Sequence, residues 1–244
     1  MSSQPATAAV IGASSGIGEA MVRQLAREGT RVAAVARRKE LLDKLAAEFP
    51  DKVTVYVHDV HDFHEAPGVF DRIVADLGQL DLLIYNAGVM PAVAESEYNF
   101  AKDREMIEVN LLGAMAWMNP CGAYMEARRS GTIVGISSVA GDRGRRGNPG
   151  YHTSKAALTT YLEALRNRLS RYGVTVVTVK PGPTRTPMTE GMKLPLLIGA
   201  EEAAAGALAH ARNGSVSGYV PAIWGPIMAI ICAVPSAIFR RTNI

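Results

Sequence analysis

The sequence predicts a single α/β domain, residues 1–244, in which helices cover both faces of a parallel β-sheet and an apolar helix ends the chain. Short apolar runs alternate with helix-length segments, which is the pattern of βαβ units. No linker or internal repeat interrupts this alternation. Apolar residues make up 48% of the chain and charged residues 20%, which suits a protein with a large buried core.

Six runs rich in valine and isoleucine are the predicted strands. Their nearly continuous apolar character indicates burial on both faces, as in a doubly wound parallel sheet. They span Thr7–Ile11, Arg31–Ala36, Val53–Val57, Asp81–Tyr85, Thr132–Ile136 and Val174–Val179. The segment GYVPAIW, residues 218–224, fits one further strand at the end of the sheet.

Five segments between these strands have the length and composition of helices. Gly29 and Gly173 follow two of them, at the position where glycine commonly ends a helix. The predicted helices span Ile17–Glu28, Lys39–Phe49, Val69–Leu77, Tyr98–Arg128 and His152–Tyr172.

The segment VIGASSGIGEA leaves the first strand and opens the first helix. Glycines in such a turn let the backbone approach a pyrophosphate, because the N–H groups and the dipole at a helix N-terminus favour anions. The spacing G-x-x-x-G-x-G differs from the common G-x-G-x-x-G, but its place after the first strand indicates a dinucleotide site. The candidate contacts are Gly12, Ser14, Ser15, Gly16, Ile17 and Gly18.

Arg37 and Arg38 follow the second strand, where dinucleotide-binding domains select between NAD and NADP. Ala36 stands where an acidic residue would bind the ribose 2′-hydroxyl of NAD. A basic pair at the start of a helix opposes the helix dipole, whereas a 2′-phosphate would stabilise it. The sequence therefore predicts NADP(H).

Tyr151 and Lys155 lie four residues apart in YHTSK, on one face of a predicted helix. A free tyrosine has a pKa of about 10, and a neighbouring ammonium together with an oxidised nicotinamide would lower it. Ser138, just after the fifth strand, offers a hydroxyl to a substrate oxygen. These three residues are candidates for acid–base catalysis.

In these motifs the chain resembles the short-chain dehydrogenase/reductase family over almost its whole length. The resemblance implies a Rossmann-type fold and hydride transfer between NADP(H) and a carbonyl or secondary alcohol. It rests on Gly12–Gly18, Asp59–Val60, Asn86–Gly88, Asn110, Ser138, Tyr151, Lys155, Pro181–Gly182, Thr184 and Thr186.

The resemblance also implies a role for each residue of the catalytic group. Tyr151 is the expected general acid and base, and Ser138 polarises the substrate oxygen. Lys155 is expected to hold the ribose and to lower the pKa of the tyrosine. Asn110 is expected to support a proton relay.

The remaining motif residues imply cofactor contacts. Asp59 and Val60 would border the adenine, and Thr186 would contact the carboxamide. Residues expected to line the rest of the cofactor cleft are Asn86, Ala87, Gly88, Pro181, Gly182 and Thr184. Two positions depart from the family: Ile11 commonly is threonine, and Ser15 is basic in many NADP-binding members, which leaves Arg37 and Arg38 to bind the phosphate.

Two segments near the expected active-site mouth are candidates for substrate binding. The loop VAGDRGRRGNPG carries Arg143, Arg145 and Arg146, which suit a phosphate or carboxylate on the substrate. A solvated or subunit-contacting loop is the alternative. Met188 and Met192 lie in the apolar segment MTEGMKLPLLIG, at the position of the family's mobile substrate lid.

The chain from Asn213 to Phe239 has no charged side chain, and Arg240 and Arg241 then follow. A helix that starts at Pro226 and runs to Phe239 would be about 21 Å long, shorter than the roughly 30 Å hydrocarbon core of a bilayer. Pro235 would interrupt it. We expect either a peripheral membrane contact, with the arginines at the headgroups, or a buried lid or subunit helix.

An anion-binding loop beside apolar segments predicts an amphiphilic substrate. The segments GDRGRRGN and VPSAIFRR are similar to one subgroup, the reductases that work with a flavin oxidase to epimerise decaprenylphosphoryl ribose through a 2-keto intermediate. This similarity implies a lipid-linked keto-sugar. Two alternatives are a dehydrogenase of steroid, retinoid or acyl substrates, and an NADP-sensing regulator without turnover, against which the complete catalytic group argues.

Other functions are disfavoured by composition and spacing. A net charge of +3 without a basic run gives no nucleic-acid surface. His58, His61 and His64 point in diverging directions, so no metal site is expected. Two isolated cysteines and a start without a signal-peptide pattern predict the cytoplasm, at the inner membrane face if the tail binds lipid. The family resemblance implies a homodimer or homotetramer.

Overall fold

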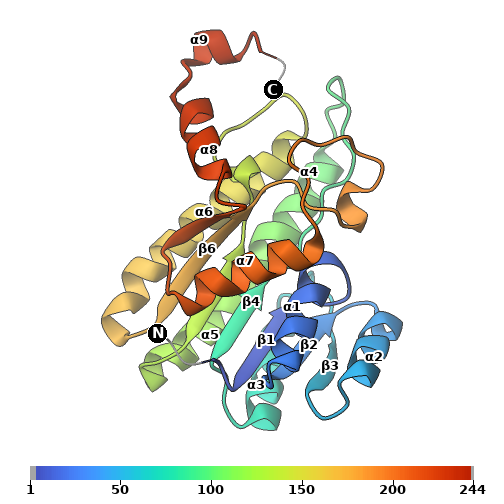
Figure 1. Ribbon diagram of the computed structural model, residues 1–244, viewed down its shortest axis with the longest axis vertical. Helices are drawn as coiled ribbons and strands as arrows, with labels where there is room; N and C mark the ends of the chain where they lie inside the picture. Colours follow the sequence, from blue (N-terminus) through green and yellow to red (C-terminus); the bar gives the residue numbers. More distant parts are fainter. Residues whose placement is uncertain (1–3, 243–244) are drawn as a thin grey trace.

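Seven parallel strands form the central sheet in the order β3-β2-β1-β4-β5-β6-β7. The computed structural model describes residues 4–242 (Figure 1). The last strand ends at Val220, before Trp224, because Pro221 has no N–H for the ladder. The strands are β1 (Thr7–Ile11), β2 (Arg31–Ala36), β3 (Val53–Val57), β4 (Leu82–Tyr85), β5 (Thr132–Ile136), β6 (Thr175–Pro181) and β7 (Ser217–Val220).

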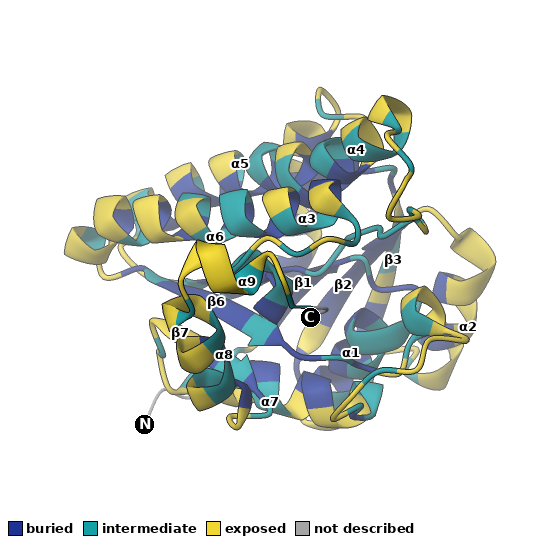
Figure 2. Cartoon of the chain, turned by 90° about the horizontal axis from the view of Figure 1, so that it is seen from above, coloured by how far each residue is buried: buried dark blue, intermediate teal, exposed yellow. Residues whose placement is uncertain are grey.

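The helices lie in two layers, with α1, α2 and α7 on one face of the sheet and α3, α5 and α6 on the other (Figure 2). They span α1 (Gly16–Arg27), α2 (Lys39–Glu48), α3 (Ala66–Leu77), α4 (Phe100–Ile107), α5 (Gly113–Arg128), α6 (Pro149–Leu169), α7 (Ala200–Arg212), α8 (Trp224–Ala233) and α9 (Ser236–Phe239). Short turns complete the fold: η1 (Glu108–Leu112), η2 (Val139–Gly141), η3 (Ser170–Tyr172) and η4 (Pro187–Thr189).

Two apolar clusters hold these layers together. Side chains of one parity along β1, such as Val10, pack with α1 and α7, and those of the other parity, such as Ile11, pack with α3, α5 and α6. Trp117 of α5 is fully buried in the second cluster. Burial of a large apolar side chain stabilises a fold by about 1.5–3 kcal/mol. The sheet has one apolar cluster on each face, which confirms the prediction that helices cover both faces.

Helix α7 is absent from the predicted set. Its inward face consists mainly of alanines, including Ala203, Ala204 and Ala207, which pack closely against α1. Small side chains carry little hydrophobic signal, although alanine is the strongest helix former. The glutamates in its first turn and Arg212 in its last turn agree with the helix dipole.

The predicted helix Tyr98–Arg128 is interrupted in the middle by η1, a π-helical turn. Such turns insert one extra residue and often occur at functional sites. The buried Tyr85 hydroxyl at the end of β4 donates to the Val109 carbonyl at 2.6 Å, inside this turn. The turn places Asn110 in the interior, where its side chain is fully buried.

The C-terminal tail forms α8 and α9, which project from the carboxyl end of the sheet (Figure 1). Helix α8 begins at Trp224, so Pro226 occupies its third position instead of the expected first one. Pro235 separates the two helices, as predicted. Within residues 4–242, none of the helices combines the length and the apolar character that crossing a membrane requires.

Candidate active site

A cavity of about 740 Å³ opens at the carboxyl ends of the strands. It lies where the strand order reverses between β1 and β4, which is where open α/β sheets bind their ligands. Its wall contains the glycine turn, both arginines after β2, and Ser138, Tyr151 and Lys155. The fold therefore brings together Gly12 and Lys155, which are 143 residues apart in the chain (155 − 12).

The glycine turn is packed so closely that side chains would not fit. Gly12 has φ +90°, and a Cβ there would meet the backbone nitrogen of Ala87 at 2.6 Å. A Cβ on Gly18 would collide with the Gly12 carbonyl. The Asn86 side chain donates to the same carbonyl at 3.0 Å, and thus ties the turn to the end of β4.

The start of α1 is suited to an anion. The Ser15 side chain at the N-cap makes no capping hydrogen bond, which leaves the first N–H groups of α1 facing the turn. Arg38 donates to the Ser14 hydroxyl at 2.8 Å and to the Ser15 hydroxyl at 2.6 Å. The turn therefore combines backbone donors with a guanidinium group.

Arg37 lies 3.6 Å from Asp59 in an ion pair. Although burial acts in the opposite direction, hydrogen bonds from His61 and the charge of Arg37 lower the pKa of Asp59, which stays ionised. Asp59 is not on the cavity wall, where Val60 and His58 lie instead. Its side chain contacts Arg37 and His61, and the adenine contact of Asp59 stays a prediction.

The catalytic candidates meet where the loop after β5 faces the start of α6. Ser138 caps η2, where its Oγ accepts the Ala140 N–H at 3.0 Å. Tyr151 is hydrogen-bonded to Ser138. Lys155 lies one helical turn further, is buried, and donates to the Ile136 carbonyl at 2.9 Å.

Burial controls the protonation of this group. It raises the pKa of Tyr151, and the hydrogen bond with Ser138 only partly opposes the increase. It lowers the pKa of Lys155 to about 8. Lys155 Nζ lies 5.8 Å from the centre of the Tyr151 ring, and the lowering of the tyrosine pKa by this ammonium together with an oxidised nicotinamide stays a prediction.

Asn110 does not line the cavity but supports its wall. Its Oδ1 accepts from the Val89 N–H at 2.8 Å, and its Nδ2 donates to the Val89 carbonyl at 3.1 Å and to Ser154 Oγ at 2.9 Å. A Cβ on Gly88 would lie 3.3 Å from Asn110 Oδ1 and 3.5 Å from Lys155 Nζ. Asn110 thus joins the loop after β4 to the helix that carries Tyr151 and Lys155.

The loop after β6 also lines the cavity. Thr184 donates to the Gly182 carbonyl at 3.0 Å, and Thr186 caps η4. A Cβ on Gly182 would collide with the indole of Trp224, so this loop packs directly beneath α8. Pro181, Gly182, Thr184, Thr186, Met188 and Met192 all line the cavity.

The arginine loop is attached to the C-terminal tail. Arg143 does not line the cavity: it donates to the carbonyls of Ile231 and Cys232 at 2.5 and 3.0 Å and lies 3.9 Å above the Phe239 ring. The structure therefore places Arg143 at the carboxyl end of α8, which attracts a cation, and not on the cavity wall where its substrate contact was predicted.

Arg145 and Arg146 do line the cavity. Arg145 lies 3.7 Å from the Met228 sulfur, and its buried Nε has no hydrogen-bond partner among the described residues. Burial lowers the pKa of its guanidinium. Arg146 donates to the Arg240 carbonyl at 3.0 Å.

Three polar residues of the site were not predicted. Asn148 caps α6 just before Tyr151 and donates to the Pro91 carbonyl at 2.9 Å. Ser154 binds Asn110, and Ser137 Oγ donates to the Lys155 carbonyl at 3.0 Å. The sequence NPG indicates the first, since asparagine before proline is a common helix start, whereas the other two depend on contacts between distant elements.

The histidine-rich loop after β3 does not converge. His58 packs edge-on against Trp117, whereas His61 binds Asp59 at 3.0 Å. Over the part of the chain that the structure describes, no group of three or more His, Cys, Asp or Glu side chains is placed to hold a metal ion.

Comparison with known proteins agrees with this geometry. The sequence model of the short chain dehydrogenase family matches residues 6–195. The chain is 35% identical over 194 residues to the 3-oxoacyl-(acyl-carrier-protein) reductase FabG of Thermotoga maritima, with 76% of each chain covered. It is 30% identical over 240 residues to an uncharacterized oxidoreductase of Mycobacterium tuberculosis, with 95% of each covered.

Solved structures show the same fold. A short chain dehydrogenase from Burkholderia cenocepacia, in complex with NADP, superposes with a TM-score of 0.86 at 26% identity and covers 99% of this chain and 98% of its own. A short-chain dehydrogenase from Streptomyces avermitilis gives a TM-score of 0.83 at 27% identity, with 95% of each chain covered.

Proposed function

The chain belongs to the short-chain dehydrogenase family and is an NADP-dependent oxidoreductase, and we propose that it reduces a ketone on an amphiphilic substrate. The observation that carries the catalytic proposal is the convergence of Ser138, Tyr151 and Lys155 on one wall of the cavity. A hydroxyl donor, a phenol and an ammonium in one place suit proton transfer to an oxygen that gains charge.

The residues of the cavity fit NADP(H). The glycine turn leaves room only for a backbone, as a bound pyrophosphate requires, and Arg37 and Arg38 suit the 2′-phosphate. Val60 would border the adenine, Lys155 the ribose and Thr186 the carboxamide. When bound, the cofactor supplies the hydride.

The chain's own residues handle the oxygen and the proton. Ser138 Oγ, which accepts the Ala140 N–H, donates its own proton to the substrate oxygen. Tyr151 Oη gives its proton to the same oxygen during reduction and takes it back during oxidation. Lys155 Nζ, held by the Ile136 carbonyl, places a positive charge beside the phenol, and Asn110 keeps the surrounding loops in register for a proton relay.

The substrate proposal rests on two kinds of side chain that line the cavity. Arg145 and Arg146 are cationic, whereas Met188, Met192 and Leu194 of the lid segment MTEGMKLPLLIG are apolar. A keto-sugar linked to a polyprenyl phosphate has an anion close to its reacting carbon and hydrocarbon beyond, and matches this division. A neutral steroid, retinoid or acyl substrate is the second candidate, favoured by the fact that both arginines also contact the tail.

Replacing Arg145 with methionine separates these two candidates. We expect kcat/KM for a polyprenylphosphoryl keto-sugar to fall by about 10- to 100-fold, as for loss of a charged hydrogen bond, while a neutral aliphatic ketone of similar length is reduced normally. Arg143→Met is the matched control, because it removes a guanidinium from the same loop but not from the cavity. Equal losses on both substrates with Arg145→Met would favour the neutral candidate.

We further propose that the tail binds a membrane surface, which would place the enzyme at the inner face of the cell membrane. Trp224 and Met228 of α8 are buried against the domain, but Ile223 and Ile230 are 53% and 69% exposed, and Ile238 of α9 is 56% exposed. Arg240 and Arg241 follow these apolar side chains, as in interfacial helices that bind anionic lipid.

Flotation with liposomes tests this contact. The protein is expected to float with vesicles of phosphatidylglycerol and phosphatidylcholine, and the double variant Ile223→Glu, Ile230→Glu is expected to lose most of this binding. Val216→Glu is the matched control, since Val216 is 61% exposed but lies beside β7, outside the tail. Flotation that the double variant retains, or that the wild type lacks, contradicts the membrane contact.

A further inference from the structure

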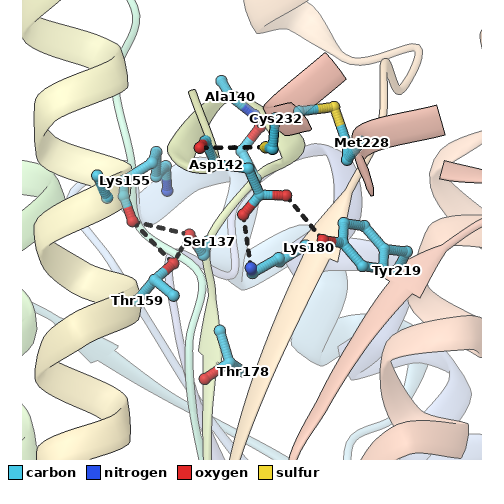
Figure 3. Close-up of polar contacts among 12 residues, drawn as sticks. Ser137, Ala140, Asp142, Lys155, Thr159, Thr178, Lys180, Tyr219, Met228 and Cys232 are labelled. Carbon is cyan, nitrogen blue, oxygen red and sulfur yellow. Dashed lines mark hydrogen bonds and ion pairs between the residues drawn. The ribbon is translucent and has the colours of Figure 1, made fainter. Parts of the chain in front are cut away.

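Asp142 is the centre of a mostly buried polar cluster beside the active site (Figure 3). One of its carboxylate oxygens lies 2.5 Å from Lys180 Nζ of β6, with 9% and 13% of the two side chains exposed. The other accepts the Tyr219 hydroxyl of β7 at 2.9 Å. Lys180 Nζ also lies 5.4 Å from the centre of the Tyr219 ring, so the three side chains form a closed set of contacts.

This cluster lies at the end of the segment that carries Ser138. Residues 137–142 pass between the cluster on one side and α6 on the other. On the α6 side, Ser137 Oγ contacts the Lys155 carbonyl and Thr159 Oγ1 (Figure 3). A Cβ on Gly141 would lie 2.8 Å from the Lys155 carbonyl carbon, so the segment has no room to move closer to the helix.

Helix α8 closes the same segment from outside. The Cys232 thiol donates to the Asp142 carbonyl at 3.5 Å. Val139 of η2 packs with Trp224 and Met228 in a separate apolar cluster. Residues near both ends of α8 therefore touch the turn that begins at Ser138.

We propose that Asp142, Lys180 and Tyr219 are positioning residues, which hold the Ser138 turn at its working distance from Lys155 and make α8 a structural part of the active site. None of the three lines the cavity, so their effect must pass through the turn. The inference depends on the reductase activity proposed above only for its kinetic test.

The physical basis is the low exposure of the ion pair. A carboxylate and an ammonium that are removed from water compensate each other's charge. Removing one of them leaves the other as an uncompensated buried charge. Burial, with Asp142 as hydrogen-bond acceptor and negative charge, raises the pKa of Tyr219, so its hydroxyl remains a donor. If Asp142 loses its charge, the chain between Ser138 and Arg143 loses its ion pair with Lys180 of β6.

Asp142→Asn tests the proposal. With phenanthrenequinone as the probe ketone, we expect kcat to fall about 10-fold while the NADPH Kd stays unchanged, because small displacements of a catalytic group have large effects on rate. Hydrogen–deuterium exchange of the cofactor-free protein should increase in peptides covering residues 137–145 and 224–233, but not in the glycine turn 12–18.

Charge-conserving and distant variants provide the controls. Lys180→Met should lower kcat as Asp142→Asn does, whereas Lys180→Arg should retain most of the kcat. In the double variant Asp142→Asn, Lys180→Met, the loss of activation free energy should be smaller than the sum of the losses in the two single variants. Asp81→Asn makes the same chemical change in an ion pair with Arg128, at the opposite end of the sheet. It should lower Tm without a selective loss of kcat.

Unchanged kcat and exchange in Asp142→Asn would overturn the proposal, as would a general increase in exchange that includes residues 12–18. If the wild-type protein does not reduce the probe ketone, the proposed reaction is in doubt. The exchange measurements still decide whether the cluster holds the Ser138 turn.

Discussion

Replacing Tyr151 with phenylalanine is expected to lower kcat by about 10³-fold, because the variant lacks the phenol whose proton is transferred to the substrate oxygen. The ring and its packing remain, so the NADPH Kd and Tm should change little. Stopped-flow measurement of NADPH oxidation with a ketone, together with NADPH fluorescence titration, separates the two effects.

Tyr161→Phe is the matched control for this experiment. Tyr161 lies on the same helix, and its hydroxyl donates to Asn119 at 2.9 Å, away from the cavity wall. Normal turnover by Tyr151→Phe would refute its role as proton donor. Loss of turnover with unchanged biological activity of the Tyr151→Phe protein would instead support the NADP-sensing regulator.

Lys155→Met is expected to combine a large loss of activity with a gain in stability. Burial lowers the pKa of Lys155 from its ordinary 10.5 to about 8, so the folded state disfavours the charged form. A difference of this size corresponds to a cost on the order of 3 kcal/mol at pH 7. Methionine has a similar shape without the charge, and should recover part of that cost while kcat falls by about 10²-fold.

The stability difference between wild type and Lys155→Met changes with pH in a defined direction. Below pH 8, Lys155 is charged in both the folded and unfolded states and the full cost is present. Between about pH 8 and 10.5 the unfolded state binds more protons, so the wild-type free energy of unfolding rises with pH relative to Lys155→Met. The wild-type rate of ketone reduction should fall as pH rises through about 8, and this limb should be absent from the variant.

Urea unfolding of the cofactor-free proteins at pH 7 and pH 10 measures the first effect, and the pH profile of kcat measures the second. A Lys155→Met protein that is less stable than wild type at pH 7 would contradict the burial cost. An unchanged profile between pH 7 and 9 would show that Lys155 does not control the rate.

Much of the fold and of the catalytic group could be predicted from local patterns. The apolar runs of β1 to β6, the glycine turn and the spacing of Tyr151 and Lys155 all depend on neighbours within one strand, turn or helical turn. Periodicity and glycine chemistry act over that range, so one sequence is sufficient to recognise them. The alanine-rich α7 and the π-helical turn at Asn110 lacked such a signal.

The direction of the arginine loop could not be predicted in the same way. Arg143, Arg145 and Arg146 look equivalent in the sequence, but only the last two line the cavity, whereas Arg143 binds the carboxyl end of α8. The difference depends on where a helix 88 residues further along the chain comes to lie. Likewise, the pKa of Tyr151 depends on how the surrounding loops exclude water.

The nucleotide-binding fold, the glycine turn and the candidate catalytic tyrosine and lysine thus follow from the amino-acid order, since each rests on short-range geometry. Three features follow only from the folded structure. They are the contact of Asp142 with Lys180 and Tyr219, the packing of α8 against the Ser138 turn, and the desolvation of Lys155. These features join residues 38 to 90 positions apart, and long-range packing and burial, which no local pattern encodes, determine them.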